Sequence, residues 1–245
     1  MSGTEYLKIF LAETLGTMIL ILLGDGVVAN VVLKKTKGNN SGWIVITMGW
    51  AFGTFVPALM LSKYSGSHFN PALSLALACT KKIKWINLPF YFLGEFFGAF
   101  LGACLVFLFY YDHFNDSEEG EEEAKLSVFS TIPAIKNKIV NFFSEVVATF
   151  VLVLGILMMG DYSYVSGVGC ITTANLILVI GLSLGGTTGY AINPCRDLSP
   201  RIAHSILPIP GKGSSQWDYA WIPVFGPFVG AVLAGYFYKL FKLLD

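Results

Sequence analysis

Charged side chains are scarce in this 245-residue sequence. Only 13% of the residues are Asp, Glu, Lys or Arg, which is about half the share found in soluble domains. The 16 basic and 16 acidic side chains give a formal net charge of zero, which excludes a nucleic-acid binder that acts through net positive charge. The four cysteines are too few for a disulfide-stabilised scaffold, and their spacing matches no metal-binding motif.

Apolar side chains are abundant instead. Hydrophobic residues make up 54% of the chain, aromatic residues 15%, and the mean hydropathy is +0.64. So many aromatic side chains would not stay solvated along a flexible chain, which excludes a disordered protein. The composition therefore predicts an integral membrane protein, and the apolar segments described next predict that it is all-α.

Six apolar segments approach the length of about 20 residues that crosses a hydrocarbon core about 30 Å thick. The first is not a cleaved signal peptide, because Glu5 weakens its basic start and the apolar run continues past signal length. The predicted spans are residues 7–32, 42–63, 87–111, 138–160, 169–187 and 219–241.

Two further apolar segments, residues 70–79 and 193–203, are too short to span and begin with Asn-Pro. Proline in the first helical turn starts a helix without the loss of a needed hydrogen-bond donor, so both segments are predicted to be half-helices. Non-helical backbone at membrane depth is tolerated only where it is buried in protein or lines water. The two half-helices therefore predict a cavity.

The chain also repeats itself. Glu13 stands four residues before Thr17, and Glu145 stands four residues before Thr149. Each half then supplies a second span, a half-helix and a third span. Three crossings per half reverse the direction of the second half, and inverted repeats with broken helices indicate a site at the midplane of the membrane. The predicted organisation is a first repeat, an acidic connecting loop and a second repeat, at residues 1–112, 113–136 and 137–245.

Two interpretations are open for the intramembrane carboxylates Glu13 and Glu145. They could form a proton relay, or each could accept hydrogen bonds from backbone amides of a re-entrant loop. Their matched placement favours the structural role. The acidic run at 112–125 is predicted to be a solvated loop, with a cation-collecting mouth as the alternative. The lysines are spread too evenly to set the orientation in the membrane.

The segments SGSHFNPAL (65–73) and GYAINPCRDLSPR (189–201) resemble the two pore loops of the major intrinsic protein family, the aquaporins and glycerol facilitators. The resemblance covers essentially the whole chain. It implies an aquaporin-like fold of six transmembrane helices and two half-helices, with one pore per subunit and usually a homotetramer. It also implies a plasma-membrane protein with both termini in the cytoplasm and no cofactor.

The motif residues themselves are Asn70, Pro71 and Ala72 in the first half and Asn193, Pro194 and Cys195 in the second. Cys195 stands where the family usually has alanine, Ser67 replaces another common alanine, and Ser199 stands where glycine is frequent. All three replacements are small, so the fold is expected to be retained.

The resemblance also implies a mechanism at the pore centre. Opposed half-helices would bring their positive dipole ends together there. Asn70 and Asn193 would each cap a helix with the amide oxygen and present the NH2 group to the pore. A passing water or hydroxyl would accept from both, which breaks the chain of donors that a proton needs, while the dipoles oppose cations, as in aquaporins generally.

Family spacing places the selectivity filter at Trp50, Gly181, Tyr190 and Arg196. This set resembles the glycerol branch, because glycine at 181 leaves room for a large aromatic at 190. The resemblance also implies a row of pore-lining carbonyls, from Gly66, Ser67, His68 and Phe69 on one side and from Tyr190, Ala191 and Ile192 on the other.

The predicted function is passive conduction of glycerol and other small neutral solutes, together with water, and exclusion of ions and protons. No catalytic triad, metal cluster or phosphate loop suggests an enzyme. One alternative is a secondary active transporter, which also uses inverted repeats but needs intramembrane charges for ion coupling; the candidates are Glu13, Glu95, Glu145 and the Arg196–Asp197 pair. The other is a family member selective for water, hydrogen peroxide or a small acid.

Overall fold

The computed structural model describes residues 3–116, 120–162 and 167–244, and its regular secondary structure is helical. Five helices are long and apolar enough to cross a membrane, whereas α8, with 17 residues, is shorter. Each begins and ends within a few residues of a predicted span. The long helices are α1 (Gly3–Val32), α2 (Trp43–Ser65), α4 (Leu88–Phe109), α7 (Lys138–Met159), α8 (Val168–Leu184) and α10 (Ile222–Leu244).

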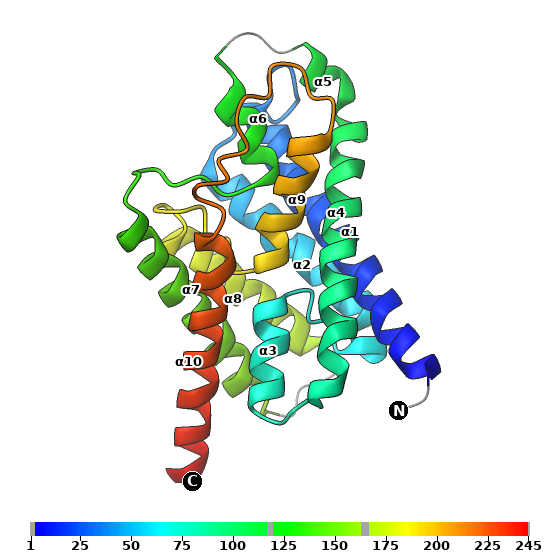
Figure 1. The fold of residues 1–245 in the computed structure, drawn as a ribbon, viewed down its shortest axis with the longest axis vertical. Coiled ribbons are helices and arrows are strands. Elements are labelled where there is room, and N and C mark those ends of the chain that lie inside the picture. The colour runs from blue at the N-terminus through cyan, green and yellow to red at the C-terminus, as the bar shows by residue number, and fades with distance from the viewer. Residues whose placement is uncertain (1–2, 117–119, 163–166, 245) are drawn as a thin grey trace.

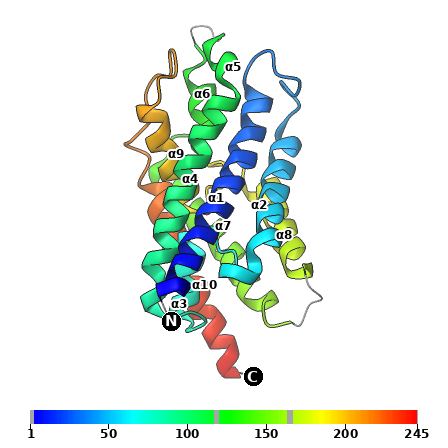
Figure 2. The ribbon, with the colours of Figure 1, turned by 90° about the vertical axis from the view of Figure 1, so that its right-hand side faces the viewer.

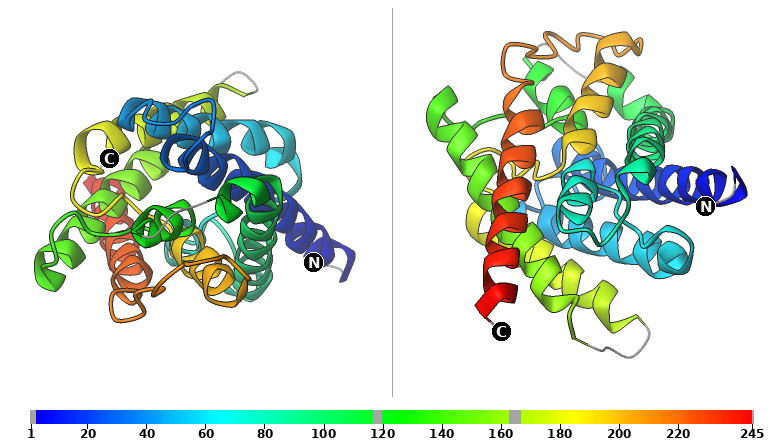
Figure 3. Two further views of the ribbon diagram at one scale, coloured as in Figure 1. Left: turned by 90° about the horizontal axis from the view of Figure 1, so that it is seen from above. Right: turned by 60° about the horizontal axis from the view of Figure 1, so that its bottom comes forward.

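The helices form a ring in which the three long helices of each repeat lie next to one another. Helix α1 packs on α4 and α2, α2 packs on α8, and α8 packs on α7, which lies against α10. The half-helices α3 (Pro71–Cys79) and α9 (Pro194–Ile206) fill the gap between α10 and α4. Figure 3 shows this arrangement along and oblique to the long axis. Each half-helix thus contacts the last long helix of the other repeat.

Glycines spaced four residues apart on α4 let this helix approach α1 closely. A Cβ atom added at Gly94, Gly98 or Gly102 of α4 would lie 2.3 to 2.7 Å from a backbone carbonyl oxygen of α1. Gly230 of α10 meets α7 in the same way, 2.3 Å from the carbonyl oxygen of Val146. Small residues at this spacing are the usual device for helix association in a membrane, where the hydrophobic effect does not drive it.

The half-helices lie end to end along the long axis, α9 above α3 in Figure 1, and their N-terminal ends meet near mid-height. Helix α1 begins and helix α10 ends at the same end of the molecule, as Figures 1 and 2 show. The segment that connects the repeats lies at the opposite end. This placement of the chain ends is what an even number of crossings requires.

The connecting segment is exposed at Asp112, Asp116, Glu122 and Glu123, as predicted for a solvated loop, but it also forms two short helices. These helices are α5 (Tyr111–Asn115) and α6 (Glu122–Phe129); a 3-10 turn, η1 (Trp85–Asn87), precedes α4 in the first repeat. Residues 117–119 of the acidic run lie outside the described residues. Helix α6 packs on α1 and α9 because its apolar side chains at 126, 128 and 129 are buried, and Lys125 is buried with its Nζ donating to the carbonyls of Pro210 and Gly211.

Candidate functional site

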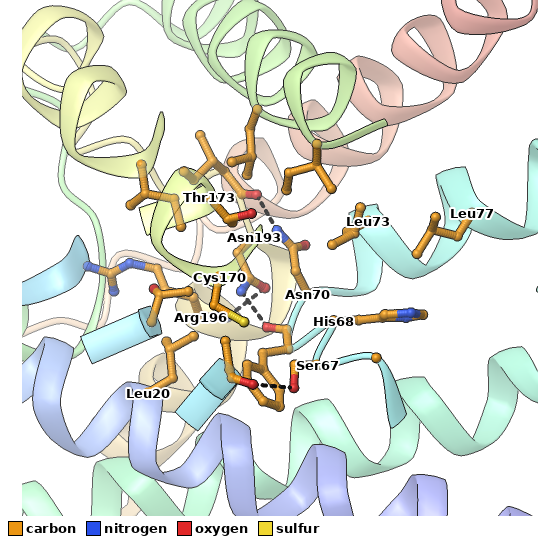
Figure 4. Close-up of a pocket in the computed structure, with 18 of the residues that line it drawn as sticks. Leu20, Ser67, His68, Asn70, Leu73, Leu77, Cys170, Thr173, Asn193 and Arg196 are labelled. Carbon is orange, nitrogen blue, oxygen red and sulfur yellow. Dashed lines mark hydrogen bonds between the residues drawn. The ribbon is translucent and has the colours of Figure 1, made fainter. Parts of the chain in front are cut away.

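A cavity of about 350 Å³ passes between the repeats at the level where the half-helices meet. Its lining includes Asn70 and Asn193 and an apolar wall that contains Leu20, Leu152 and Ile177. Figure 4 shows this lining, with both asparagines at its centre. A second cavity of about 230 Å³ shares Trp50, Tyr190 and Arg196 with the first. These three residues, here called the constriction residues, therefore separate an outer vestibule from the inner passage.

The two asparagines cap their own half-helices. The Oδ1 of Asn70 accepts from the amide of Ala72 at 3.0 Å, and the Oδ1 of Asn193 accepts from the amides of Cys195 and Arg196 at 3.1 and 3.3 Å. Pro71 and Pro194 occupy the first helical positions, where the missing N–H costs no hydrogen bond. The Asn-Pro pairs from which both helix starts were predicted therefore do mark the first residues of these helices.

The asparagine NH2 groups also join the two repeats, a feature that the sequence did not predict. Asn70 Nδ2 donates to the carbonyl of Ile192, and Asn193 Nδ2 donates to the carbonyl of Phe69, both at 2.8 Å. Each NH2 carries two hydrogens, so one remains for a solute in the cavity.

The intramembrane carboxylates hold the loops that precede the half-helices. Glu13 accepts from the amides of His68 and Phe69 at 3.1 and 2.7 Å, and from the hydroxyl of Ser65. Glu145 accepts from the amides of Ala191 and Ile192 at 3.0 and 2.9 Å, and from the hydroxyl of Thr188 at 2.6 Å. The two sets of bonds are the same in both repeats, which supports the structural role over a proton relay.

The bound loops have an unusual backbone. Residues three and one before each asparagine adopt left-handed φ values: Ser67 at 55° and Phe69 at 50°, Tyr190 at 41° and Ile192 at 45°. Such conformations are costly for residues other than glycine and persist only where the surroundings hold them. All the residues predicted to supply pore carbonyls line the cavity: Gly66, Ser67, His68, Phe69, Tyr190, Ala191 and Ile192.

Gly181 lies directly behind the aromatic side chain of the constriction. A Cβ atom at position 181 would be 2.8 Å from Cζ of Tyr190 and 2.9 Å from Cγ2 of Thr47. The carbonyl of Gly181 accepts from Nε1 of Trp43 at 2.9 Å, and the Trp43 ring meets the Tyr190 ring edge-on. Only glycine at this position leaves the Tyr190 ring where it is.

The guanidinium of Arg196 lies over the ring of Trp50. Its Cζ lies 3.9 Å from the centroid of the Trp50 ring, a favourable cation–π geometry. Its Nη1 and the Tyr190 hydroxyl have no hydrogen-bond partner within the described residues. Both residues line the two cavities, so a solute that passes from one cavity to the other meets these side chains.

Sequence reasoning missed one residue of this site. Asp25, in the first span, is fully buried, and its Oδ1 lies 3.5 Å from Nη1 of Arg196. The available signal was a carboxylate inside an apolar helix, which by itself indicates a functional position.

The cysteine next to the second asparagine is less accessible than its motif position suggests. Cys195 is fully buried, and its Sγ lies 3.1 Å from Oδ1 of Asn193. Cys170 of α8, which the sequence gave no reason to single out, lines the cavity and is drawn there in Figure 4. The thiol that a mercurial can reach from the cavity is therefore Cys170, whereas Cys195 is buried.

We expect mercury(II) to inhibit conduction through Cys170, because a metal ion that enters the cavity meets that thiol first. A Cys170→Ser variant should retain solute flux in the presence of mercuric chloride, whereas a Cys195→Ser variant should stay as sensitive as the native chain. Light-scattering assays on proteoliposomes measure both. Resistance of the Cys195→Ser variant would contradict the assignment.

Comparison with known proteins agrees with this geometry. The sequence model of the major intrinsic protein family matches residues 1–238. The glycerol uptake facilitator protein of Streptococcus pneumoniae (strain ATCC BAA-255 / R6) is 53% identical over 231 residues, which cover 94% of this chain and 97% of the relative. That of Bacillus subtilis (strain 168) is 49% identical over 230 residues, which cover 94% and 83%.

A solved structure gives the same result for the fold. The X-ray structure of the aquaglyceroporin from Plasmodium falciparum matches with a TM-score of 0.85 at 30% sequence identity, covering 97% of this chain and 99% of that chain. The predicted all-helical membrane fold of the aquaporin type is thereby confirmed.

Proposed function

This chain belongs to the major intrinsic protein family, and we propose that it is a passive membrane channel for glycerol and other small neutral solutes, which also conducts water. It is a multi-pass membrane protein of a channel family and not an enzyme. The relatives named as glycerol uptake facilitators cover nearly the whole chain. The observation that carries the substrate assignment is the constriction, where Trp50, Tyr190 and Arg196 line both cavities.

The constriction and the passage suit a solute that is polar along one edge. Trp50 and Tyr190 offer ring surface to a carbon chain, while the Arg196 guanidinium offers a planar set of donors to neighbouring hydroxyls. Further along, the loop residues that line the cavity supply carbonyl acceptors opposite an apolar wall that includes Leu20 and Leu152. A polyol can replace its hydrogen bonds to water with hydrogen bonds to these carbonyls, while its carbon atoms stay against the apolar wall.

Ions and protons are excluded by the electrostatics of the same path. The N-terminal ends of α3 and α9 face the centre with their positive dipole ends, and Arg196 adds a cationic group at the constriction. The free hydrogens of Asn70 and Asn193 orient the single solute between them, which interrupts proton transfer along a water chain.

The assembly is proposed to be a homotetramer in the plasma membrane with both termini in the cytoplasm. Large apolar side chains cover the outside of the ring, among them Phe109 at 77% exposure and Ile139 at 83%. Such side chains are suited to contact lipid or neighbouring subunits. Helix α1 begins and helix α10 ends at the same end of the molecule, as the proposed orientation needs.

Stopped-flow light scattering on proteoliposomes tests the function directly. Under a glycerol gradient we expect fast re-swelling, with a flux that rises linearly with glycerol concentration and does not depend on an ion gradient. Fast water flux without glycerol entry would favour the water-selective alternative. Saturation together with ion-gradient dependence would favour a secondary active transporter.

Removal of the arginine tests the constriction. We expect Arg196→Ala to admit larger polyols and charged solutes, because the variant loses both side-chain volume and the cationic barrier. Swelling rates for a series of polyols and salts, relative to the native chain, measure this change. An unchanged order of permeabilities would contradict the filter assignment.

A further inference from the structure

One buried acid at the constriction has no part in the mechanism described so far. Asp25 is 0% exposed, and both of its carboxylate oxygens lack a hydrogen-bond donor within the described residues. A buried carboxylate without such donors is costly unless an opposite charge compensates it. The compensating charge is Arg196, whose Nη1 is 3.5 Å from Oδ1 of Asp25.

The position of Asp25 is set by close packing of two helices. A Cβ atom at Gly24 would lie 2.2 Å from the Trp50 ring, so the ring rests directly on the α1 backbone. The same ring carries the guanidinium of Arg196 on its face. Helix α1 therefore presents Asp25 to Arg196 from behind the constriction, and Asp25 itself does not line either cavity.

The separation of the pair has a chemical consequence. At 3.5 Å the charges attract, yet Nη1 of Arg196 has no hydrogen-bond partner within the described residues. Nη1 is buried on the side of Asp25, whereas Arg196 lines both cavities, so the guanidinium meets a solute with its charge balanced. A cationic guanidinium without a counter-charge binds carboxylates strongly through paired N–H donors.

We propose that Asp25 is a specificity-determining residue, which balances the charge of Arg196 so that the constriction accepts neutral hydroxyl solutes and does not retain small carboxylate anions. The proposal rests on the function of Arg196 in the filter proposed above. Asp25 acts through Arg196 and is not itself a solute-binding group. Without this counter-charge, a small carboxylate would occupy the constriction and block glycerol.

The test is inhibition of glycerol flux by sodium formate at neutral pH, with sodium chloride at equal ionic strength as the reference. The variant is Asp25→Asn, which keeps the side-chain shape and removes the charge. A unit charge about 7 Å from the anion, at an effective dielectric constant of about 20, changes anion affinity by tenfold or more. We therefore expect half-inhibition of Asp25→Asn at a formate concentration at least about tenfold lower than for the native chain.

The control is a carboxylate of the outer vestibule. Glu123 lines the outer cavity and is exposed, so its charge is screened by salt. Glu123→Gln should leave formate sensitivity unchanged. Equal formate sensitivity of Asp25→Asn and the native chain would overturn the proposal, and so would a Glu123→Gln effect as large as that of Asp25→Asn.

A double variant keeps the test decisive. Asp25→Asn with Arg196→Gln removes both charges, so it should insert into liposomes even if the single variant does not, and formate should not inhibit it. Formate inhibition of the double variant would contradict an action through Arg196, and failure of the double variant to insert would contradict the pairing itself. Native glycerol flux is measured first, because its absence would contradict the proposed function. In that case formate inhibition is measured on water flux instead, which still reports on Asp25.

Discussion

Gly181→Leu should reduce glycerol permeability by at least about tenfold, which corresponds to an added barrier of about 1.4 kcal/mol. The leucine side chain would need the space in which Cζ of Tyr190 now lies, 2.8 Å from where its Cβ atom would be. Thr47 blocks retreat on the other side at 2.9 Å. The Tyr190 ring is therefore expected to move into the passage between the vestibule and the inner cavity.

Two companion variants separate this effect from general damage. A Cβ atom at Gly186 meets no atom within 4 Å, so Gly186→Leu should leave the glycerol flux unchanged. Adding Tyr190→Ala to Gly181→Leu removes the displaced ring and should restore much of the flux. Proteoliposome swelling, normalised to inserted protein, measures all three. A Gly181→Leu channel that conducts glycerol at the native rate would show that position 181 does not limit the constriction.

Glu145→Ala should abolish conduction of glycerol and water together. The amides of Ala191 and Ile192 would lose their acceptor in a buried site, at a cost of about 1–3 kcal/mol for each unsatisfied group. These amides belong to a loop with left-handed residues at 190 and 192, which would relax once the carboxylate no longer holds them. The relaxed loop would no longer line the cavity.

The assay for Glu145 uses water and glycerol flux together with thermal stability of the purified protein. Glu145→Gln keeps one acceptor oxygen but turns an NH2 group toward the loop. We therefore expect its losses of flux and of thermal stability to be smaller than those of Glu145→Ala. A proton relay would give a different pattern, in which Glu145→Gln changes proton leak and leaves solute flux intact. Native fluxes in Glu145→Ala would rule out the loop-holding role.

Much of the architecture was readable from local sequence patterns. Long apolar runs predicted the spans because backbone polar groups in a membrane must be satisfied within a helix. Asn70-Pro71 and Asn193-Pro194 predicted the half-helix starts because capping and the position of proline are local properties of the chain. The repeated Glu-Thr spacing predicted matched roles for Glu13 and Glu145. In the structure each carboxylate accepts hydrogen bonds from the re-entrant loop of its own repeat.

Other features depended on contacts between distant segments. The acidic residues of the connecting segment predicted a solvated loop, and they did not reveal that the short helix α6 at its end is stabilised by burial against α1 and α9. Access to Cys170 rather than Cys195 was not readable either. Cys195 is covered in the structure, and its thiol faces the Asn193 side chain.

The sequence by itself determined the membrane class, the inverted repeat, the two helix starts at the pore centre and, through its motifs, the family. These follow from composition and from interactions between residues close in the chain. Only the tertiary structure decided that Trp50, Tyr190 and Arg196 separate two cavities, that each asparagine bonds to the opposite loop, and that Asp25 stands behind Arg196. Those facts join α1, α2 and the two loops, and the separation at which such segments meet is set by the packing of the whole ring.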